Sequence, residues 1–264
     1  MDEFAINQVY NEDSLQALPK LPSDSFDLII CDGPYGRGEF NWDKKKSVQE
    51  FNLYLIKEFS RILKKGGVLY LFGKHDLLDF IDYRPYLLLH RRIIWYIPSS
   101  LAQGRRNYTN NYDVIAYFSK GRVKTFNLDD IRVPQLVELE HRRRCENVPS
   151  VKSGRYGKTK FNDRGKNPGD VWGDIKPLTY RSRELLDYQY LHTVQKPLKL
   201  MERLIRASSQ PQDLVLDPFA GTGTALVAAK KLDRQYLGFE IDSRLYRICK
   251  ERLALLDENK ALAV

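Results

Sequence analysis

The stretch Asp217-Pro218-Phe219-Ala220-Gly221-Thr222-Gly223-Thr224 decides the fold that we expect for this chain. It follows a short apolar strand over 213–216 and precedes a helix over 225–232, and the next strand, over 235–240, ends in Glu240. The glycines allow a ligand to approach the backbone closely, and an acid at the end of the next strand can accept both hydroxyls of a ribose. This layout is typical of a site for an adenosine-type cofactor.

The glycine spacing narrows the choice of cofactor. Ala225 and Leu226 follow Thr224, so the third glycine of the dinucleotide pattern Gly-x-Gly-x-x-Gly is missing. The missing third glycine disfavours NAD and FAD, whose pyrophosphate is bound by the complete pattern. S-adenosylmethionine, a nucleoside with a charged amino-acid tail and no pyrophosphate, fits better.

The same alternation of strands and helices extends outward on both sides of this stretch. Helices are expected at 195–207, with Pro197 in the first turn, at 243–256, and at 47–65, the last stopped by Gly66-Gly67. Buried strands are expected at 26–31 and 68–72, and strand–helix–strand order implies a parallel sheet with a right-handed crossover. A short helix is expected at 76–81. Two further strands, over 86–97 and 113–118, lack a helix between them and suggest an antiparallel pair at the sheet edge.

A second polar stretch, Asp32-Gly33-Pro34-Tyr35, follows the apolar strand over 26–31. A carboxylate and backbone carbonyls there can accept hydrogen bonds from an amino group, while a tyrosine ring stacks on the plane beside it. The arrangement suits a flat, polar, uncharged group. An Asp-Gly-Pro turn after a strand is also common turn chemistry, so these residues alone leave both interpretations open.

The positive charge of the chain is concentrated in one segment. Between His141 and Arg183 there are 12 Lys or Arg and four acids, a difference of +8, against +9 for the whole chain. Aromatic residues are interleaved with these charges, and helical or strand periodicity fades from 120 to 190. A solvated basic loop is the alternative, but a block of this size favours a nucleic-acid surface.

Composition excludes several classes of protein. No apolar run approaches the ~20 residues that span a bilayer, and the N-terminal residues do not resemble a secretory signal. Cys31, Cys145 and Cys249 are far apart and show no metal-ligand spacing, so we expect reduced thiols, no metal, and an intracellular, cytoplasmic protein.

Four motifs together resemble the amino-group DNA methyltransferases, in the permuted order with the catalytic motif before the cofactor motif. Asp32-Gly33-Pro34-Tyr35 resembles the family's Asp-Pro-Pro-Tyr, and 217–224 resembles its cofactor motif. His192-Thr193-Val194-Gln195-Lys196-Pro197 is similar to its His-Pro-Thr-Gln-Lys-Pro, and 167–172 to its Asp-Val-Trp stretch. The resemblance spans most of the chain. It implies a Rossmann-like α/β fold with a catalytic half over 1–119, a basic target-recognition insert over 120–190, and a cofactor-binding half over 191–264.

The resemblance also implies roles for individual residues. Asp32, with the backbone carbonyl of Gly33 or Pro34, would accept hydrogen bonds from the target amino group, and Tyr35 would stack on the base. Phe219 would lie along the cofactor, Glu240 would hold its ribose, Asp13 its adenine edge and Lys196 its carboxylate. The expected cofactor-binding residues are Asp13, Asp32, Lys196, Asp217, Phe219, Gly221, Gly223, Thr224 and Glu240. The expected DNA-binding residues are Arg105, Arg106, Arg142, Arg143, Arg144, Lys158 and Lys160.

The activity implied is transfer of a methyl group from S-adenosylmethionine to the exocyclic amino group of adenine in duplex DNA, with the base flipped out of the stack. Adenine is favoured because the first motif residue is Asp, whereas the cytosine branch more often has Ser. Cytosine-N4 is the alternative substrate. A catalytically silent, cofactor- and DNA-binding subunit is the alternative of another class, because Gly33 replaces the family's Pro. A cognate restriction endonuclease and a homodimer are further expectations.

Overall fold

The computed structural model describes residues 3–34, 48–79, 81–98, 108–134, 163–179, 181–182, 184–185 and 195–261. Within these residues, eight strands form one sheet in the order β1-β8-β7-β2-β3-β5-β4-β6. The strands are β1 (Gln8–Tyr10), β2 (Phe26–Cys31), β3 (Leu63–Gly73), β4 (Leu88–Tyr96), β5 (Tyr112–Ser119), β6 (Val171–Trp172), β7 (Leu214–Asp217) and β8 (Gln235–Phe239). The helices are α1 (Ser14–Ala17), η1 (Leu18–Lys20), α2 (Val48–Ile62), η3 (Leu128–Asp130), α4 (Leu198–Ser208), α5 (Thr224–Lys231) and α6 (Ser243–Ala261).

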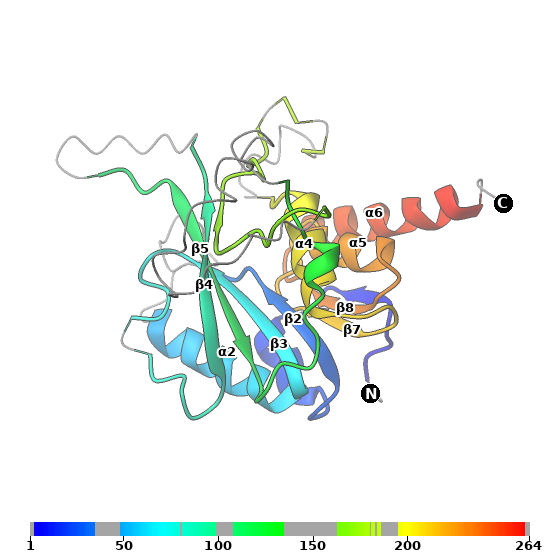
Figure 1. The fold of residues 1–264 in the computed structure, drawn as a ribbon. Coiled ribbons are helices and arrows are strands. Elements are labelled where there is room, and N and C mark those ends of the chain that lie inside the picture. Colours follow the sequence, from blue (N-terminus) through cyan, green and yellow to red (C-terminus); the bar gives the residue numbers. More distant parts are fainter. Residues whose placement is uncertain are drawn as a thin grey trace, which may run out of the picture.

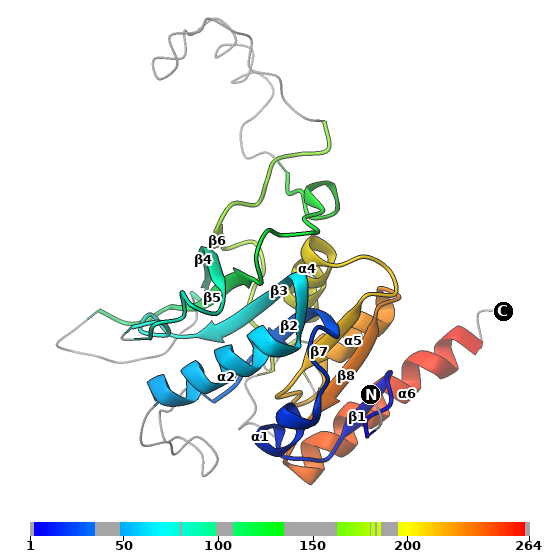
Figure 2. The same ribbon diagram turned by 90° about the horizontal axis from the view of Figure 1, so that it is seen from below.

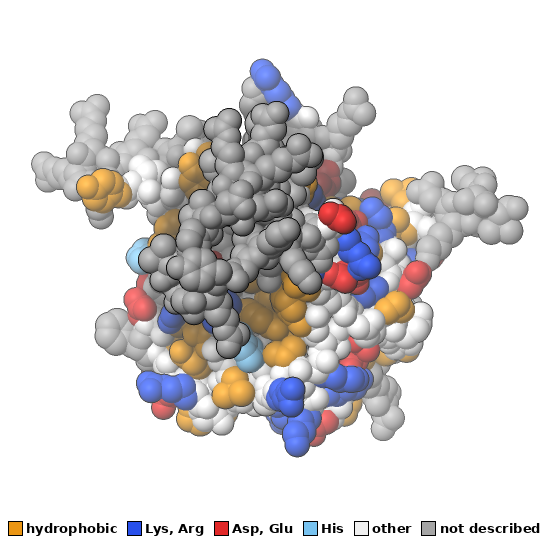
Figure 3. Space-filling view, in the orientation of Figure 1, with side chains coloured by type: hydrophobic (Ala, Val, Ile, Leu, Met, Phe, Trp, Pro, Cys, Tyr) orange, Lys and Arg blue, Asp and Glu red, His pale blue; other side chains and the backbone are white. Residues whose placement is uncertain are grey.

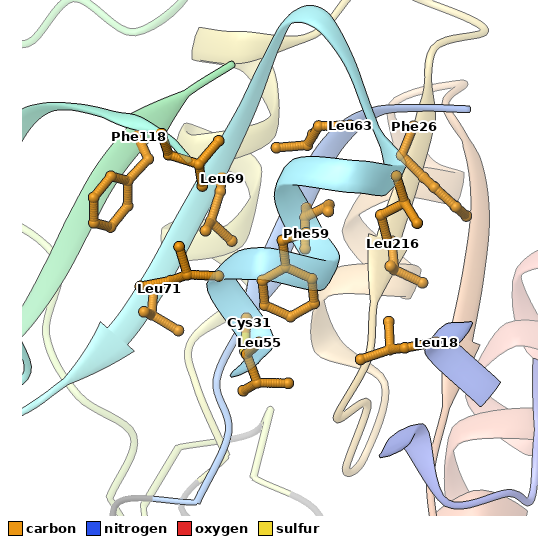
Figure 4. Close-up of a cluster of buried hydrophobic side chains, with 14 of the residues drawn as sticks. Leu18, Phe26, Cys31, Leu55, Phe59, Leu63, Leu69, Leu71, Phe118 and Leu216 are labelled. Carbon is orange, nitrogen blue, oxygen red and sulfur yellow. The ribbon is translucent and has the colours of Figure 1, made fainter. Parts of the chain in front are cut away.

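Helices cover both faces of this sheet, α1 and α2 on one side and α4, α5 and α6 on the other (Figures 1 and 2). The central strand β2 is buried at all six positions, which is why its sequence is a nearly continuous apolar run. Its side chains alternate between the two layers. Ile29 and Cys31 pack in the cluster that contains Phe59 of α2, drawn in Figure 4, whereas Leu28 and Ile30 pack with residues of α4 and α5.

Strand direction confirms the expected mostly parallel α/β sheet. Only β5 is antiparallel to its neighbours β3 and β4 among the described strands, and β4 is joined on its outer side by the parallel strand β6. From β2 the chain continues to β3 on one side, whereas β7 and β8 lie on the other. The sheet therefore has its topological switch point between β2 and β7, where ligands of open α/β sheets bind.

The expectation that the helix over 47–65 ends at Gly66-Gly67 is wrong. α2 ends at Ile62, and both glycines lie within β3. The backbone N–H of Gly66 donates to the carbonyl of Lys120 at 2.7 Å, and that of Lys124 donates to the carbonyl of Gly66 at 3.1 Å. Hydrogen bonds to a segment more than fifty residues away override the local helix-ending signal.

Two other expectations also need correction, and two strands were not predicted from the sequence. Residues 76–79 form turns rather than a helix, with Leu77 and Asp79 donating to carbonyls three residues earlier, because Leu77 and Leu78 fold back into the core. Pro197 is the N-cap of α4, just outside its first turn. β1 and β6 were not predicted, since strands of three and two residues are too short to produce a recognisable alternation.

Described parts of the expected insert over 120–190 are attached to the helical layer around α4. Asn127 donates through Nδ2 to the carbonyls of Arg206 and Ser209, at 2.8 and 2.9 Å. Asp174 forms an ion pair with Arg203, whose guanidinium lies 4.8 Å from the ring centroid of buried Trp172. Among the helices in the described residues, none combines the length and apolar character that a membrane span requires.

Candidate active site

Four predicted acids follow four parallel strands at one edge of the sheet. Asp13 comes after β1, Asp32 after β2 and Glu240 after β8, and Asp217 is the last residue of β7. Because parallel strands end at the same edge, the fold gathers these carboxyl groups there. β7 and β2 are hydrogen-bonded neighbours, so Asp217 and Asp32 lie on the two sides of the switch point.

Asp217 is a buried acid whose charge is strongly disfavoured. Burial raises its pKa to about 8, and the negative charges of Asp32 and Glu240 add to the effect. The backbone N–H of Phe219, which donates to Oδ1 at 3.2 Å, opposes the rise only in part. A cation bound at this edge would relieve the mutual repulsion of the three carboxyl groups.

Glu240 supports the glycine turn as well as facing the site. One carboxyl oxygen accepts from the backbone N–H of Gly221 and the other from that of Asp242, both at 2.7 Å. Burial raises the pKa of Glu240, while these two N–H donors oppose the rise. The carboxylate is thus fixed at the end of β8 by the turn that follows β7.

Gly223 is required by helix packing. It has a φ of +79°, and a Cβ added there would overlap the sulfur of Cys249 on α6. Gly221 also has a positive φ, of +53°, but an added Cβ there would have no neighbour within 4 Å. The backbone at Gly221 is therefore open to a ligand, whereas Gly223 brings α6 against the turn.

Arg252 of α6 donates hydrogen bonds to the turn over 217–224, a role that no local pattern in the sequence indicated. Its guanidinium donates to the carbonyl of Thr222 at 2.6 Å and to Oγ1 of Thr224 at 3.2 Å. Burial lowers the pKa of Arg252. The predicted cofactor residue Thr224 is therefore occupied in supporting the turn, at the first position of α5.

The turn after β2 packs directly on the turn after β7. A Cβ added at Gly33 would lie 3.2 Å from two carbons of the Phe219 ring, and Phe51 of α2 contacts the same ring at a centroid distance of 6.1 Å. Gly33 does not have a positive φ, so contact with Phe219 explains the glycine better than backbone conformation does. Asp32, Gly33 and Pro34 are described, and Tyr35 lies outside the described residues.

Lys196 contacts Asp32, the predicted hydrogen-bond acceptor. Its Nζ lies 2.7 Å from Oδ2 of Asp32, and its side chain is only 3% exposed. The ammonium also lies 5.6 Å from the ring centroid of Phe72 in β3. The sequence predicted this lysine for the cofactor's carboxylate and did not anticipate its ion pair with Asp32.

Asp13 caps α1, accepting from the backbone N–H of Leu15 at 2.9 Å. Ser14 donates to the carbonyl of Pro218, which joins α1 to the cofactor turn. Asn11 donates through Nδ2 to the carbonyls of Glu240 and Ile241, at 2.7 and 3.1 Å. Asn11 was missed, because its role depends on the pairing of β1 with β8.

Ile241 is another residue that was not predicted from the sequence. It follows Glu240 directly, and it is 61% exposed. The position after the acid of the cofactor motif was itself a signal that could have identified it. An exposed aliphatic group beside the acid predicted to bind the ribose suits contact with a nucleoside base.

The described residues fit the cofactor expected from the sequence. The crowded carboxyl groups favour a cationic ligand, and Gly221 offers open backbone. S-adenosylmethionine carries both a sulfonium and an ammonium group. No group of three or more His, Cys, Asp or Glu side chains suited to a metal ion occurs among the described residues. The predicted DNA-binding residues Arg105, Arg106, Arg142, Arg143, Arg144, Lys158 and Lys160 lie outside them.

Relatives of known activity resemble the chain over most of its length. The chain is 34% identical over 259 residues to the DNA adenine methyltransferase YhdJ of Escherichia coli (strain K12), covering 93% of this chain and 82% of that one. It is 33% identical over 255 residues to the type II methyltransferase M.HpaI of Haemophilus parainfluenzae, covering 91% and 72%.

Solved structures share the fold. The cytosine-N4-specific PvuII DNA methyltransferase superimposes with a TM-score of 0.63 at 18% identity, covering 94% of this chain and 86% of that one. A putative DNA modification methylase from Thermus thermophilus, complexed with S-adenosyl-L-methionine, gives 0.59 at 23% identity, covering 94% and 93%.

A family model described as DNA methylase, for the N6 and N4 enzymes, matches residues 26–251. That match includes β2 with Asp32, the turn after β7, and Glu240. It agrees with the relatives and with the chemistry of the site, and the cofactor is S-adenosylmethionine. The chain therefore belongs to the family of DNA methyltransferases that methylate exocyclic amino groups of bases.

Proposed function

We propose that the protein methylates the exocyclic N6 amino group of adenine in duplex DNA. The observation that carries this proposal is the position of Asp32 at the switch point, beside the turn over 217–224 and paired with a buried lysine. This position supports a role for Asp32 as the acceptor, next to the turn over 217–224 that we expect to bind the cofactor. The relative YhdJ, named a DNA adenine methyltransferase, and the Asp at the first motif position both support adenine over cytosine.

The reaction needs an acceptor because an aromatic amino group is a weak nucleophile. Its lone pair is delocalised into the ring, and hydrogen bonds from the amino group to Asp32 and to a neighbouring backbone carbonyl favour a tetrahedral nitrogen. The sulfonium of the bound cofactor supplies the electrophilic methyl group. With the cofactor bound, the amino nitrogen would form its bond to the methyl carbon as the sulfur–carbon bond breaks, and the amino proton would pass to Asp32 or to water. Alignment of the reacting atoms provides much of the acceleration.

The base must leave the duplex to reach this edge of the sheet. We propose that Tyr35 stacks on the flipped base. The insert over 120–190, and Arg105-Arg106, would bind the phosphate backbone. A cognate endonuclease is suggested by the type II methyltransferases among the relatives, and we also propose that the protein forms a homodimer.

Methyl transfer to random-sequence duplex DNA tests the proposal. Purified protein is incubated with isotope-labelled S-adenosylmethionine, and the DNA is digested and analysed by mass spectrometry. We expect labelled N6-methyladenine. Labelled N4-methylcytosine would instead establish the alternative substrate, and cofactor binding without transfer to any sequence would establish a silent subunit.

Asp32→Asn is the matched variant for this assay. Loss of the anionic acceptor should lower the rate of transfer by about 10²–10³-fold while cofactor binding survives. Asp82→Asn, at a side chain 69% exposed, is the control and should leave the rate unchanged. Near wild-type transfer by Asp32→Asn would show that another residue accepts the amino hydrogen.

A further inference from the structure

The buried side chain of Lys196 connects three parts of the active-site edge. Its ammonium pairs with Asp32 after β2 at 2.7 Å and lies 5.6 Å from the ring centroid of Phe72 in β3. Its own backbone directly precedes Pro197, the N-cap of α4. The lysine is 3% exposed and Asp32 is 23% exposed, so the pair is covered from the lysine side and reaches solvent from the acid side.

A buried ammonium is stable only when a partner compensates for the water it has lost. Desolvation of an unpaired charge costs several kcal/mol, and removing one member of a buried pair is strongly destabilising. An anionic Asp32 and the face of the Phe72 ring both supply that compensation. The same ion pair also acts on Asp32, because the lysine restricts the rotation of its carboxylate.

We propose that Lys196 is a positioning residue that holds the carboxylate of Asp32 oriented toward the target amino group, instead of binding the carboxylate of the cofactor. The inference rests on the proposed function, since it assigns the acceptor role to Asp32. A fixed anionic acceptor stabilises the nitrogen as positive charge moves onto it from the sulfonium. A carboxylate that rotates away would lose both the hydrogen bond and this charge stabilisation.

The two roles for Lys196 differ in what its removal changes. A lysine that binds the cofactor's carboxylate contributes to cofactor affinity. A lysine that positions Asp32 contributes to the rate of transfer once cofactor and DNA are bound. The second role also requires charge at this position, so arginine should replace lysine better than an uncharged chain of similar length.

The experiment compares Lys196→Met, Lys196→Arg and wild type in two measurements. The first is the single-turnover rate of methyl transfer to duplex DNA. The second is the Kd for S-adenosylmethionine and for its decarboxylated analogue. Lys199→Met, at an exposed lysine in the first turn of α4, is the control and should match wild type.

For Lys196→Met we expect the transfer rate to fall by about 10²-fold. Its Kd for S-adenosylmethionine should stay within about threefold of wild type. The decarboxylated analogue should bind more weakly than S-adenosylmethionine by the same factor in the variant as in wild type. Lys196→Arg should recover most of the rate. The inference is overturned if Lys196→Met weakens cofactor binding tenfold or more and no longer discriminates against the analogue, or if its transfer rate is unchanged.

Two further arms separate the ways in which the experiment can fail. If Lys196→Met does not fold, Lys196→Gln, which can still donate a hydrogen bond to Asp32, enters the same comparison with the same criteria. If wild-type protein transfers no methyl group, the proposed function itself fails. Transfer by wild type with an equal rate in the Lys196 variants refutes the inference alone.

Discussion

Asp217 couples the electrostatics of the site to protein stability. Burial and the charges of Asp32 and Glu240 raise its pKa to about 8, far above the ordinary value for an aspartic acid. Between pH 4 and pH 8 the folded protein keeps this proton while the unfolded chain releases it. Rising pH therefore favours the unfolded state, and the contribution of Asp217 to stability is lost through that window.

Asp217→Asn removes this proton and should remove the associated pH dependence. The wild-type free energy of unfolding should fall relative to the variant by up to about 1.4 kcal/mol per pH unit from pH 5 to pH 8. Urea denaturation of both proteins at several pH values measures the difference. Parallel pH profiles for the two proteins would contradict the assigned protonation state.

Gly33 is a second residue whose contact explains its identity. Gly33→Ala places a Cβ 3.2 Å from the Phe219 ring, tight enough that the partly exposed ring must move by a few tenths of an ångström. We expect the variant to remain folded and to bind the cofactor roughly three- to tenfold more weakly, because Phe219 lies in the cofactor turn. Isothermal calorimetry measures the change.

The coupling between Gly33 and Phe219 is testable by a double-mutant cycle with Phe219→Leu. The smaller side chain leaves room for the Cβ, so the double variant should lose less affinity than the sum of the two single losses, by about 0.5 kcal/mol or more. Strictly additive losses would mean that the Cβ at residue 33 acts without moving the ring.

At the scale of single elements, the turn between β7 and α5 is rigid because α6 packs against it. Gly223→Ala combines a positive φ with an overlap on Cys249, and it should destabilise the protein by about 3 kcal/mol or more. Gly221→Ala, with a positive φ but no steric conflict, is the matched control and should cost about 1 kcal/mol. Chemical denaturation measures the free energy of unfolding of both variants. Equal losses would show that α6 moves at Cys249 to accommodate the added Cβ.

The elements that were predicted well from the sequence are those whose signals are local. β2 begins and ends at the expected residues, and the turn over 217–224 lies between a strand and a helix as expected. Gly66-Gly67 shows the opposite case, because a hydrogen bond to Lys120 holds these residues in β3 instead of ending α2.

For the site, the sequence predicted the acids, the glycines and Lys196, but not the contacts through which Lys196 and Arg252 support them. Asp32, Asp217 and Glu240 belong to motifs that can be recognised one strand at a time. Lys196 meets Asp32, and Arg252 meets Thr222, only after distant segments have folded together. No local spacing carries that information.

At the scale of the whole molecule, charge is distributed unevenly along the chain. The segment 141–183 has a net charge of +8 out of +9. On the described part of the face in Figure 3, basic and acidic side chains are interspersed. Binding to the phosphate backbone is therefore expected to depend mainly on the segment.

Neutralising Arg142, Arg143 and Arg144 together to Gln should weaken DNA binding and flatten its salt dependence. If all three contact phosphates, the slope of log K against log salt concentration should decrease in magnitude by up to about 2.7. Fluorescence anisotropy with a labelled duplex at several salt concentrations measures the slope. Replacing the exposed Arg244, Arg247 and Lys250 of α6 removes the same charge and should leave the slope unchanged.

The pairing of β2 with β7 has a consequence for synthesis on the ribosome. β2 is translated early, but the edge that will pair with β7 stays open until residues 214–217 have been added, on the order of ten seconds or more later. An unpaired apolar strand edge exposes the nascent chain to aggregation with other chains. Translation must also pass Lys196, Glu240 and finally Arg252 before the site is complete. We therefore expect the growing polypeptide to carry Asp32 long before it can bind the methyl donor, and to transfer no methyl group until α6 has been made.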